Sequence, residues 1–174
     1  KGKLELEVLL KGMLNKETLL DLIKNFIVFE KEETLNKKLG AYHQYNAVNK
    51  ALTSTIKATR GDKKAGVVWH TQGSGKSLLM LFAAQKLRKQ QELNNPTVLI
   101  VVDRVDLDTQ ISATFNTAEV PNMTTTDNIK ELHKLLEQDT RKIIITMVHK
   151  FKDAYPDMNT RDNIIVMVDE AHRT

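Results

Sequence analysis

The segment that decides the fold is residues 66–77, GVVWHTQGSGKS, in which an apolar run leads into a glycine-rich turn and then into a helical pattern. The run over 66–70 is short, apolar and bounded by turn residues, which predicts a buried strand. From Ser77 to about Gln91, apolar side chains recur at helical spacing, and Asn94-Asn95-Pro96 ends the pattern. The segment therefore predicts a strand, a tight turn and a helix in that order.

Outside this segment, apolar runs and helical patterns alternate along the chain. Residues 97–102, 142–146 and 164–168 are continuous apolar runs, typical of strands that are buried on both faces. Helical patterns lie near 107–115 and from Asp127 onward. Because each crossover has to pack back onto the sheet, this order predicts an α/β, doubly wound domain with a mainly parallel sheet flanked by helices.

The first part of the chain carries a different pattern. Asn15 can cap a helix, and apolar residues recur at helical spacing after it. Residues 30–38 are charged and aperiodic, which we interpret as a linker or a mobile loop. The sequence therefore predicts a helical appendage or linker over 1–38 and a main domain over 39–174, which begins with a helix around 47–56.

The composition excludes several classes of protein. The chain has 174 residues, 41% of them hydrophobic and 28% charged, which fits one globular domain with an appendage. The absence of cysteine excludes disulfides, thiolate zinc sites and thiol nucleophiles. No apolar run approaches the roughly 20 residues that span a bilayer, and we expect a cytoplasmic protein. The net charge of +4 is spread without blocks of one sign, so the sequence has no basic arm that would tether nucleic acid.

The glycine-rich turn carries the first candidate site. Glycines let the backbone fold so that successive N–H groups point at phosphate oxygens, and the N-terminus of the following helix adds positive charge. Lys76 can reach the β- and γ-phosphates, and the Ser77 hydroxyl can ligate Mg²⁺. His70 stands where the strict pattern has glycine, and a chance Gly-Lys-Ser turn is the alternative. The predicted nucleotide-binding residues are Thr71, Gln72, Gly73, Ser74, Gly75, Lys76 and Ser77.

A second candidate site follows the last predicted strand, where residues 169–172 read Asp-Glu-Ala-His. Open α/β sheets bind ligands at the carboxyl ends of their strands. Asp169 can hold Mg²⁺ opposite Ser77, and Glu170 can orient and deprotonate the water that attacks the γ-phosphate. His172 can couple this chemistry to a neighbouring lobe, with a surface histidine as the alternative. We therefore predict an ATP- and Mg²⁺-dependent hydrolase with Lys76 and Glu170 as its catalytic residues.

Together these motifs resemble the first RecA-like lobe of superfamily 2 helicases and translocases, with residues 169–172 as the DEAH form of the Walker B motif. More closely, the chain resembles the motor (R) subunit of type I restriction–modification enzymes. His-Thr-Gln at 70–72 is the most specific feature. The resemblance covers nearly the whole chain and rests on residues 67–77, 101–110, 144–151 and 168–173, with 9–13 and 26–29 resembling the link between nuclease and motor.

The resemblance implies a residue that reads the base. Tyr42-His43-Gln44 resembles the adenine-reading motif of the family. The amide of Gln44 can accept from the adenine amino group while donating to a ring nitrogen, which discriminates ATP from GTP. Tyr42 or Tyr45 could stack on the base. A polar helix N-terminus followed by core tyrosines is the alternative.

The resemblance also implies contacts with double-stranded DNA. In the family, the stretch after the strand 97–102 and the stretch 146–151 face the DNA, which implies contacts by Arg104, Thr146 and Lys150. For Arg104 the alternative is an ion pair with a nearby aspartate, and for Lys150 a solvated side chain.

Taken with the resemblance, the motifs predict a RecA-like P-loop NTPase lobe that binds ATP in a double-stranded DNA translocase and drives type I restriction. The implied partners are the DNA and the modification and specificity subunits. A DEAH-type RNA or DNA helicase lobe and a non-hydrolysing nucleotide-dependent switch are the alternatives. The motifs that follow His172 in such motors, and a nuclease array before residue 40, are not found in the sequence. We therefore expect a fragment that is inactive without its nuclease domain and second lobe, which would supply an arginine finger.

Overall fold

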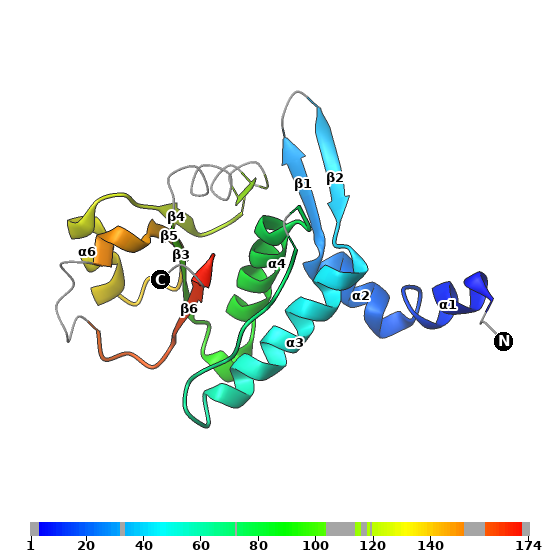
Figure 1. The fold of residues 1–174 in the computed structure, drawn as a ribbon, viewed down its shortest axis with the longest axis horizontal. Helices are drawn as coiled ribbons and strands as arrows, with labels where there is room; N and C mark the ends of the chain where they lie inside the picture. The colour runs from blue at the N-terminus through cyan, green and yellow to red at the C-terminus, as the bar shows by residue number, and fades with distance from the viewer. Residues whose placement is uncertain are drawn as a thin grey trace.

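The chain folds around a parallel sheet of four strands in the order β4-β5-β3-β6 (Figure 1). A computed structural model describes residues 4–31, 34–71, 73–103, 114–115, 118, 120–151 and 159–171. The strands are β3 (Thr97–Val102), β4 (Met123–Thr125), β5 (Ile143–Met147) and β6 (Ile164–Val168). The three strands predicted for this part of the chain are thereby confirmed, and β4 is an additional strand at the edge.

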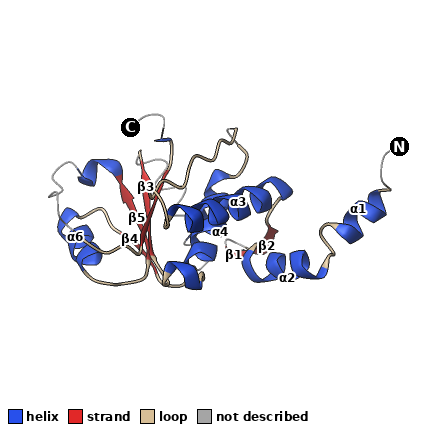
Figure 2. Cartoon of the chain, turned by 90° about the horizontal axis from the view of Figure 1, so that it is seen from below, coloured by secondary structure: helices blue, strands red, loops and turns tan. Residues whose placement is uncertain are grey.

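Helices cover both faces of the sheet. Figure 2 shows the sheet with α6 on one face and α3 and α4 on the other. The helix bounds are α3 (Tyr42–Ala58), α4 (Lys76–Arg88) and α6 (Ile129–Glu137). Every residue of β3 is buried, and its side chains alternate between the two faces. Leu99 and Val101 lie in the core cluster with α6, whereas Val98 and Ile100 lie in the cluster with α4. The α/β class and the RecA-like arrangement predicted from the sequence are confirmed.

The parallel register brings the carboxyl ends of the strands together at one edge. Val98 of β3 lies opposite Ile143 of β5 and Ile165 of β6, and β4 is also parallel to β5. In a parallel sheet, the loops that leave this edge are the ones that carry ligand sites. Asp169 follows directly after β6, so the candidate acidic residues lie at this edge.

Residues 66–70 do not form the strand predicted for them, and this prediction was wrong. Within the described part of the chain, no strand pairs with them, and Val67 and Trp69 are 83% and 86% exposed. Apolar and β-branched residues suit a pleated, half-buried surface, but a strand also needs a neighbour that completes its hydrogen-bond ladder. The described sheet ends at β6, and residues 66–70 do not pair with the outer side of that edge strand.

Most of the segment over 30–38, predicted to be a linker or a mobile loop, instead lies in two antiparallel strands, which is a second correction. Its strands are β1 (Ile27–Lys31) and β2 (Leu35–Leu39). Glu30 is only 6% exposed although it is charged, because its carboxylate pairs with Lys38 at 2.5 Å. A buried carboxylate with its own partner hides the alternation that would have indicated a strand.

The remaining helices among the described residues are short. They are α1 (Glu5–Lys11), α2 (Lys16–Asn25) and the 3₁₀ helices η1 (Gln91–Leu93) and η2 (Val148–Phe151). Asn15 caps α2 as predicted, since its side chain accepts a hydrogen bond of 3.1 Å from the Glu17 amide. The helical pattern expected from Asp127 onward is α6, which begins at Ile129; its cap is Asn128, whose side chain accepts from the Lys130 amide at 2.9 Å.

The hydrophobic core continues from α2 into the lobe. Phe26, directly after α2, is completely buried and packs against the rings of Tyr45 and Phe82, with centroid distances of 4.9 and 5.3 Å. In contrast, α1 buries no residue. The division of the chain near residue 38 stays a prediction, but the packing of Phe26 ties α2 to α3 and α4.

The helix predicted near 107–115 lies almost entirely outside the described residues. Among the helices that are described, none is long and apolar enough to cross a membrane.

Candidate nucleotide site

The phosphate loop forms a tight turn ahead of α4. Gly73 and Gly75 have φ values of 76° and 77°, a left-handed conformation that glycine adopts without steric cost. The amide and the hydroxyl of Ser74 both donate to the carbonyl of Thr71, at 3.3 and 2.6 Å. Gly75 is the N-cap residue of α4 and has no side chain to cover the first helical turn. The helix N-terminus is therefore open toward a bound anion.

The predicted ligands of the phosphates lie around this turn. Lys76 and Ser77 are the first residues of α4, so their side chains leave the helix at its positive end. Both residues are partly exposed. Gln72 lies outside the described residues, so its predicted contact stays a prediction.

The N-terminus of α3 holds the phosphate loop from the side. Gln44 is 4% exposed, and its Nε2 donates to the Gly75 carbonyl at 3.1 Å while its Oε1 accepts from the Ala41 amide at 2.8 Å. His43 Nε2 lies 3.0 Å from the carbonyl oxygen of Ser74. A Cβ atom on Gly75 would lie 2.6 Å from Gln44 Nε2, which shows how closely the two segments approach. The structure thus joins Gln44 to the loop, whereas its predicted contact with adenine stays a prediction.

The two tyrosines beside Gln44 have different surroundings. Tyr45 packs against Phe26 in the core, and burial raises its pKa above the ordinary value. Tyr42 is 85% exposed and is separated from Gln44 by His43 alone. Of the two stacking candidates, Tyr42 is therefore the one whose ring is open to a ligand.

The acidic site lies at the end of β6. Asp169 is 8% exposed, and its amide donates to the Val101 carbonyl at 2.9 Å, which fixes the start of the turn. Burial raises the pKa of Asp169 above its ordinary value, and the charge of neighbouring Glu170 also raises it. Glu170 has a φ of 50°, which is uncommon for a residue with a side chain.

An ion pair joins the two candidate sites. Lys76 Nζ lies 2.8 Å from Glu170 Oε1, and these side chains are 35% and 18% exposed. Ser77 follows Lys76 on α4 and Asp169 precedes Glu170, so the two predicted metal ligands are each adjacent to a member of this pair. The structure therefore brings the phosphate loop and the acidic turn together, as the sequence predicted.

The arrangement fits a magnesium ion that the protein holds with few ligands. No group of three or more His, Cys, Asp or Glu side chains in the described residues could hold a metal by itself. Mg²⁺ commonly keeps several waters and takes one or two protein oxygens together with nucleotide phosphates. A hydroxyl from Ser77 and a carboxylate from buried Asp169 are oxygen donors of that kind. A cation would also offset the cost of burying the Asp169 charge.

The predicted DNA contacts are placed unevenly. Arg104 and the coupling residue His172 lie outside the described residues, so their roles stay predictions. Lys150 is partly exposed on η2, just after β5 and at the same edge of the sheet as Asp169. Thr146 is 1% exposed, and among the described residues its hydroxyl finds no hydrogen-bond partner. Its side chain does not reach the surface, so we do not retain Thr146 as a DNA contact.

One contact was missed by the sequence reasoning. The sequence assigns no contact to His43 beyond its place next to Gln44. In the structure, its Nε2 contacts the Ser74 carbonyl of the phosphate loop, and its ring centroid lies 5.4 Å from that of His70. The available signal was its place in the first turn of a helix that also carries Gln44. Nothing in the spacing of 31 residues between His43 and Ser74 indicates the contact.

Comparison with known proteins identifies the family. The family model of the SWI2/SNF2 ATPases matches residues 43–174. The chain is 45% identical, over 98% of its length, to the type I restriction enzyme HindI endonuclease subunit of Haemophilus influenzae. It is 39% identical, over 97% of its length, to the putative type I restriction enzyme MjaIXP endonuclease subunit of Methanocaldococcus jannaschii. It spans only 17% of the length of each of these two relatives.

A shorter relative matches over most of both chains. The chain is 32% identical to the C-terminal part of the putative type I restriction enzyme MpnIIP endonuclease subunit of Mycoplasma pneumoniae, over 92% of this chain and 84% of that one. These matches confirm the resemblance drawn from the motifs. The chain belongs to the SWI2/SNF2 ATPase family, in the branch found in the endonuclease subunits of type I restriction enzymes.

Proposed function

We propose that this chain is the ATP-binding lobe of a double-stranded DNA translocase that drives type I restriction. The observation that carries the proposal is the 2.8 Å ion pair between Lys76 and Glu170, which unites the phosphate loop and the acidic turn in one site. The relatives named as type I restriction endonuclease subunits support the biological setting. In this proposal, ATP lies between this lobe and a second lobe of the full-length protein.

The phosphates of ATP would bind at the N-terminus of α4. Amide groups of the loop and the helix end would donate to the phosphate oxygens, and Lys76 would add a positive charge at the β- and γ-phosphates. Ser77 and Asp169 would hold Mg²⁺, which supplies positive charge that stabilises the transferring phosphoryl group. The open helix end at Gly75 supports this placement, because it has no side-chain cap.

Glu170 would act as the general base. The carboxylate accepts a proton from the water whose oxygen attacks the γ-phosphorus, and the bond to the β-phosphate oxygen breaks. While Glu170 is paired with Lys76, its oxygen is engaged with an ammonium group. When phosphates attract Lys76, the Glu170 carboxylate becomes available for the water. The ion pair thus supports a resting arrangement in which hydrolysis waits for ATP.

The proposal assigns the DNA to the edge where the strands end. Lys150, and Arg104 by resemblance, would contact backbone phosphates, which positions the duplex without reading its sequence. The modification and specificity subunits would be the partners of the full-length protein, in the cytoplasm. A DEAH-type RNA helicase would have the same lobe but would bind single-stranded RNA in place of duplex DNA. Comparing the binding of duplex DNA and of single-stranded RNA by the full-length protein distinguishes these two functions.

The test of the motor itself is Glu170→Gln in the full-length protein, assayed for ATP retention and for displacement of a triplex-forming strand from DNA. A motor is expected to hold ATP and stop translocating, because the amide cannot take the proton from water. A nucleotide-dependent switch that does not hydrolyse ATP would behave like the parent protein. Unchanged strand displacement would therefore reject the proposal. Glu137→Gln, at the end of α6, is a control substitution of the same type.

A further inference from the structure

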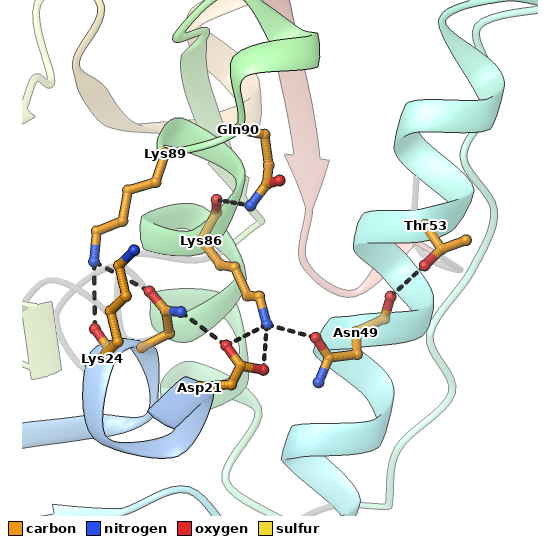
Figure 3. Close-up of polar contacts among 8 residues, drawn as sticks. Asp21, Lys24, Asn49, Thr53, Lys86, Lys89 and Gln90 are labelled. Carbon is orange, nitrogen blue, oxygen red and sulfur yellow. Dashed lines mark hydrogen bonds and ion pairs between the residues drawn. The ribbon is translucent and has the colours of Figure 1, made fainter. Parts of the chain in front are cut away.

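A buried lysine lies at the junction of three helices. Most side chains in the middle of α4 are apolar and buried, but Lys86, near its C-terminal end, is also buried, at 7% exposure. Lysine is rarely buried unless its charge is paired. Figure 3 shows its side chain directed between α2 and α3.

The ammonium group of Lys86 has a short contact for each of its protons. It donates to both carboxylate oxygens of Asp21 on α2, at 2.7 and 2.6 Å, and to Asn49 Oδ1 on α3, at 2.6 Å (Figure 3). An ammonium has three donors, so its hydrogen-bonding capacity is used in full. The same group lies 5.1 Å from the ring centroid of Phe26. One side chain of α4 is therefore bonded to two other helices at once.

The partner carboxylate is itself fixed from several sides. Asn25 Nδ2 donates to Asp21 Oδ1 at 2.8 Å. Burial alone would raise the pKa of Asp21, but hydrogen bonds from Lys86 and Asn25 and the charge of Lys86 hold it below its ordinary value. Asp21 is thus ionised at neutral pH and restrained in position, and it does not act as a mobile counter-charge.

A buried ion pair is weak evidence for stability, because removing both charges from water costs about as much as their attraction returns. What such a pair can do better than apolar side chains is to select one geometry, since its directional bonds break when a helix turns or slides. At α4, a slip along or around the helix axis would break all the short bonds to Asp21 and Asn49. An apolar contact would tolerate the same slip.

The helix that Lys86 fixes is the one that begins at the phosphate loop. At its N-terminal end, Gln44 of α3 bonds to Gly75, and near its C-terminal end, Asn49 of the same α3 bonds to Lys86. A helix is a stiff rod, so a change of register at one end is carried to the other. The bonds of Lys86 therefore affect the positions of Lys76 and Ser77 at the other end of α4.

We propose that Lys86 is a positioning residue, whose bonds to Asp21 and Asn49 fix the register of α4 against α2 and α3 and thereby place Lys76 and Ser77 for the nucleotide phosphates. This inference rests on the proposed nucleotide site. A purely structural role would affect the stability of the protein and leave the nucleotide affinity of the folded protein unchanged.

The experiment separates affinity from stability in the full-length protein. Asp21→Leu combined with Lys86→Met removes both charges. Met has nearly the volume of Lys, and the larger Leu replaces Asp21, whose side chain is partly exposed. The readouts are thermal unfolding, binding of a fluorescent ATP analogue with Mg²⁺, and hydrogen exchange of residues 73–80 without nucleotide. We expect a melting temperature near that of the parent, roughly tenfold weaker binding, which corresponds to about 1.4 kcal/mol, and faster exchange in the loop.

The control is the hairpin ion pair of Glu30 with Lys38, which also has one buried member but joins β1 to β2. Glu30→Leu combined with Lys38→Met is expected to leave both nucleotide binding and loop exchange at the level of the parent. Asn49→Ala, which keeps the Asp21–Lys86 pair, covers the case in which the first double variant does not fold. It is expected to show the same changes, reduced to a few-fold.

Two results would overturn the inference. The first is parental affinity and loop exchange in a folded variant at Asp21 and Lys86, or in Asn49→Ala if that is the only variant that folds. The second is an equal weakening in the hairpin control. If the parent protein itself bound no nucleotide, the proposed function would fail, and loop exchange alone would still decide whether Lys86 sets the register of α4.

Discussion

Lys76 and Glu170 are separated by 94 positions in the sequence and by 2.8 Å in space. Their side chains are partly exposed, so water screens the attraction and the pair contributes little to stability. Because the ion pair contributes little free energy, another anion can replace Glu170 as the partner of Lys76. An ATP γ-phosphate carries more negative charge than one carboxylate, so it competes well for Lys76. At the scale of single residues, the proposed hydrolysis would therefore need Lys76 to exchange Glu170 for a phosphate.

Asp169→Asn is expected to have opposite effects on folding and on binding. The raised pKa of Asp169 means that the folded chain holds its proton more tightly than the unfolded chain, so stability falls as the pH rises from the ordinary aspartate range through the raised value. Without Mg²⁺ at neutral pH, the variant should therefore unfold at a higher temperature than the parent. Loss of the carboxylate should weaken Mg²⁺-dependent nucleotide binding by at least about tenfold.

Thermal unfolding between pH 3 and 8, followed by circular dichroism, measures the first effect, and titration with a fluorescent ATP analogue measures the second. Asp139→Asn is the control with the opposite sign, because the hydrogen bond from Arg141 holds the pKa of Asp139 below its ordinary value. The stability supplied by Asp139 is present above the ordinary aspartate range and is lost as the pH falls through its lowered pKa. An Asp169→Asn variant that is less stable and still binds Mg²⁺ and nucleotide normally would contradict the assignment.

At the scale of elements, the phosphate loop depends on a close approach between α3 and the start of α4. Gly75→Ala should disturb it twice, because Gly75 has a φ of 77° and an added Cβ would lie 2.6 Å from Gln44 Nε2. The left-handed backbone alone costs about 1–2 kcal/mol for a residue with a side chain. We expect a loss of stability of about that size, measured by urea unfolding, together with weaker nucleotide binding.

The matched control is Gly61→Ala, whose Cβ would meet only the Ala58 carbonyl at 3.9 Å. It should leave both stability and binding close to those of the parent. If Gly75→Ala bound nucleotide normally, the close approach of Gln44 to Gly75 would not be needed for nucleotide binding.

The elements that could be predicted from the sequence are those that a local pattern identifies, such as an apolar run or a helical spacing of apolar residues. β3 and β5 are continuous apolar runs between helical patterns, which is typical of strands buried in a parallel sheet. The run over 66–70 has the same apolar pattern. A strand also needs a neighbouring strand for its backbone hydrogen bonds, and the sequence of the run itself does not indicate whether one is present. The hairpin of β1 and β2 was missed for the opposite reason, since buried Glu30 looks like a surface residue until its partner Lys38 is known.

The same distinction holds within the candidate site. The loop and the acidic turn follow from motif and topology, because each stands at the carboxyl end of a strand or at the start of a helix. The contact of Gln44 with Gly75 joins residues 31 positions apart and depends on how α3 crosses α4. The angle and position at which α3 crosses α4 depend on side-chain packing along both helices, so no local sequence pattern predicts the contact.

The element formed by α2 and the hairpin should behave as part of the lobe. Phe26→Ala would open a cavity between Tyr45 and Phe82, and such a loss costs about 3–5 kcal/mol at a fully buried site. We expect this loss in urea unfolding, with a single cooperative transition. The control Ile23→Ala removes a side chain that is 57% exposed and should change stability by less than about 0.5 kcal/mol. Equal effects of both substitutions would show that α2 folds independently of the lobe.

At the scale of the whole molecule, the lobe forms one wall of the proposed ATP site. The phosphate loop and the acidic turn lie at one edge of the sheet, and the ion pair of Lys76 with Glu170 spans them. In the proposed function, this wall would supply amides, the Lys76 ammonium, the oxygen ligands of Mg²⁺ and the base Glu170. Stabilising the charge that develops on the leaving phosphate commonly needs a further cation, such as an arginine supplied by another domain.

The isolated chain is therefore expected to bind ATP and hardly hydrolyse it. Removing an arginine finger from a phosphoryl-transfer site lowers turnover by about 10³- to 10⁵-fold. Binding of a fluorescent ATP analogue with Mg²⁺, and phosphate release with and without duplex DNA, would measure the two properties. The full-length protein, assayed in parallel, should release phosphate at a rate that DNA increases. Substantial DNA-stimulated hydrolysis by the isolated chain would mean that every charge the reaction needs already lies within these residues, and that a second lobe does not complete the site.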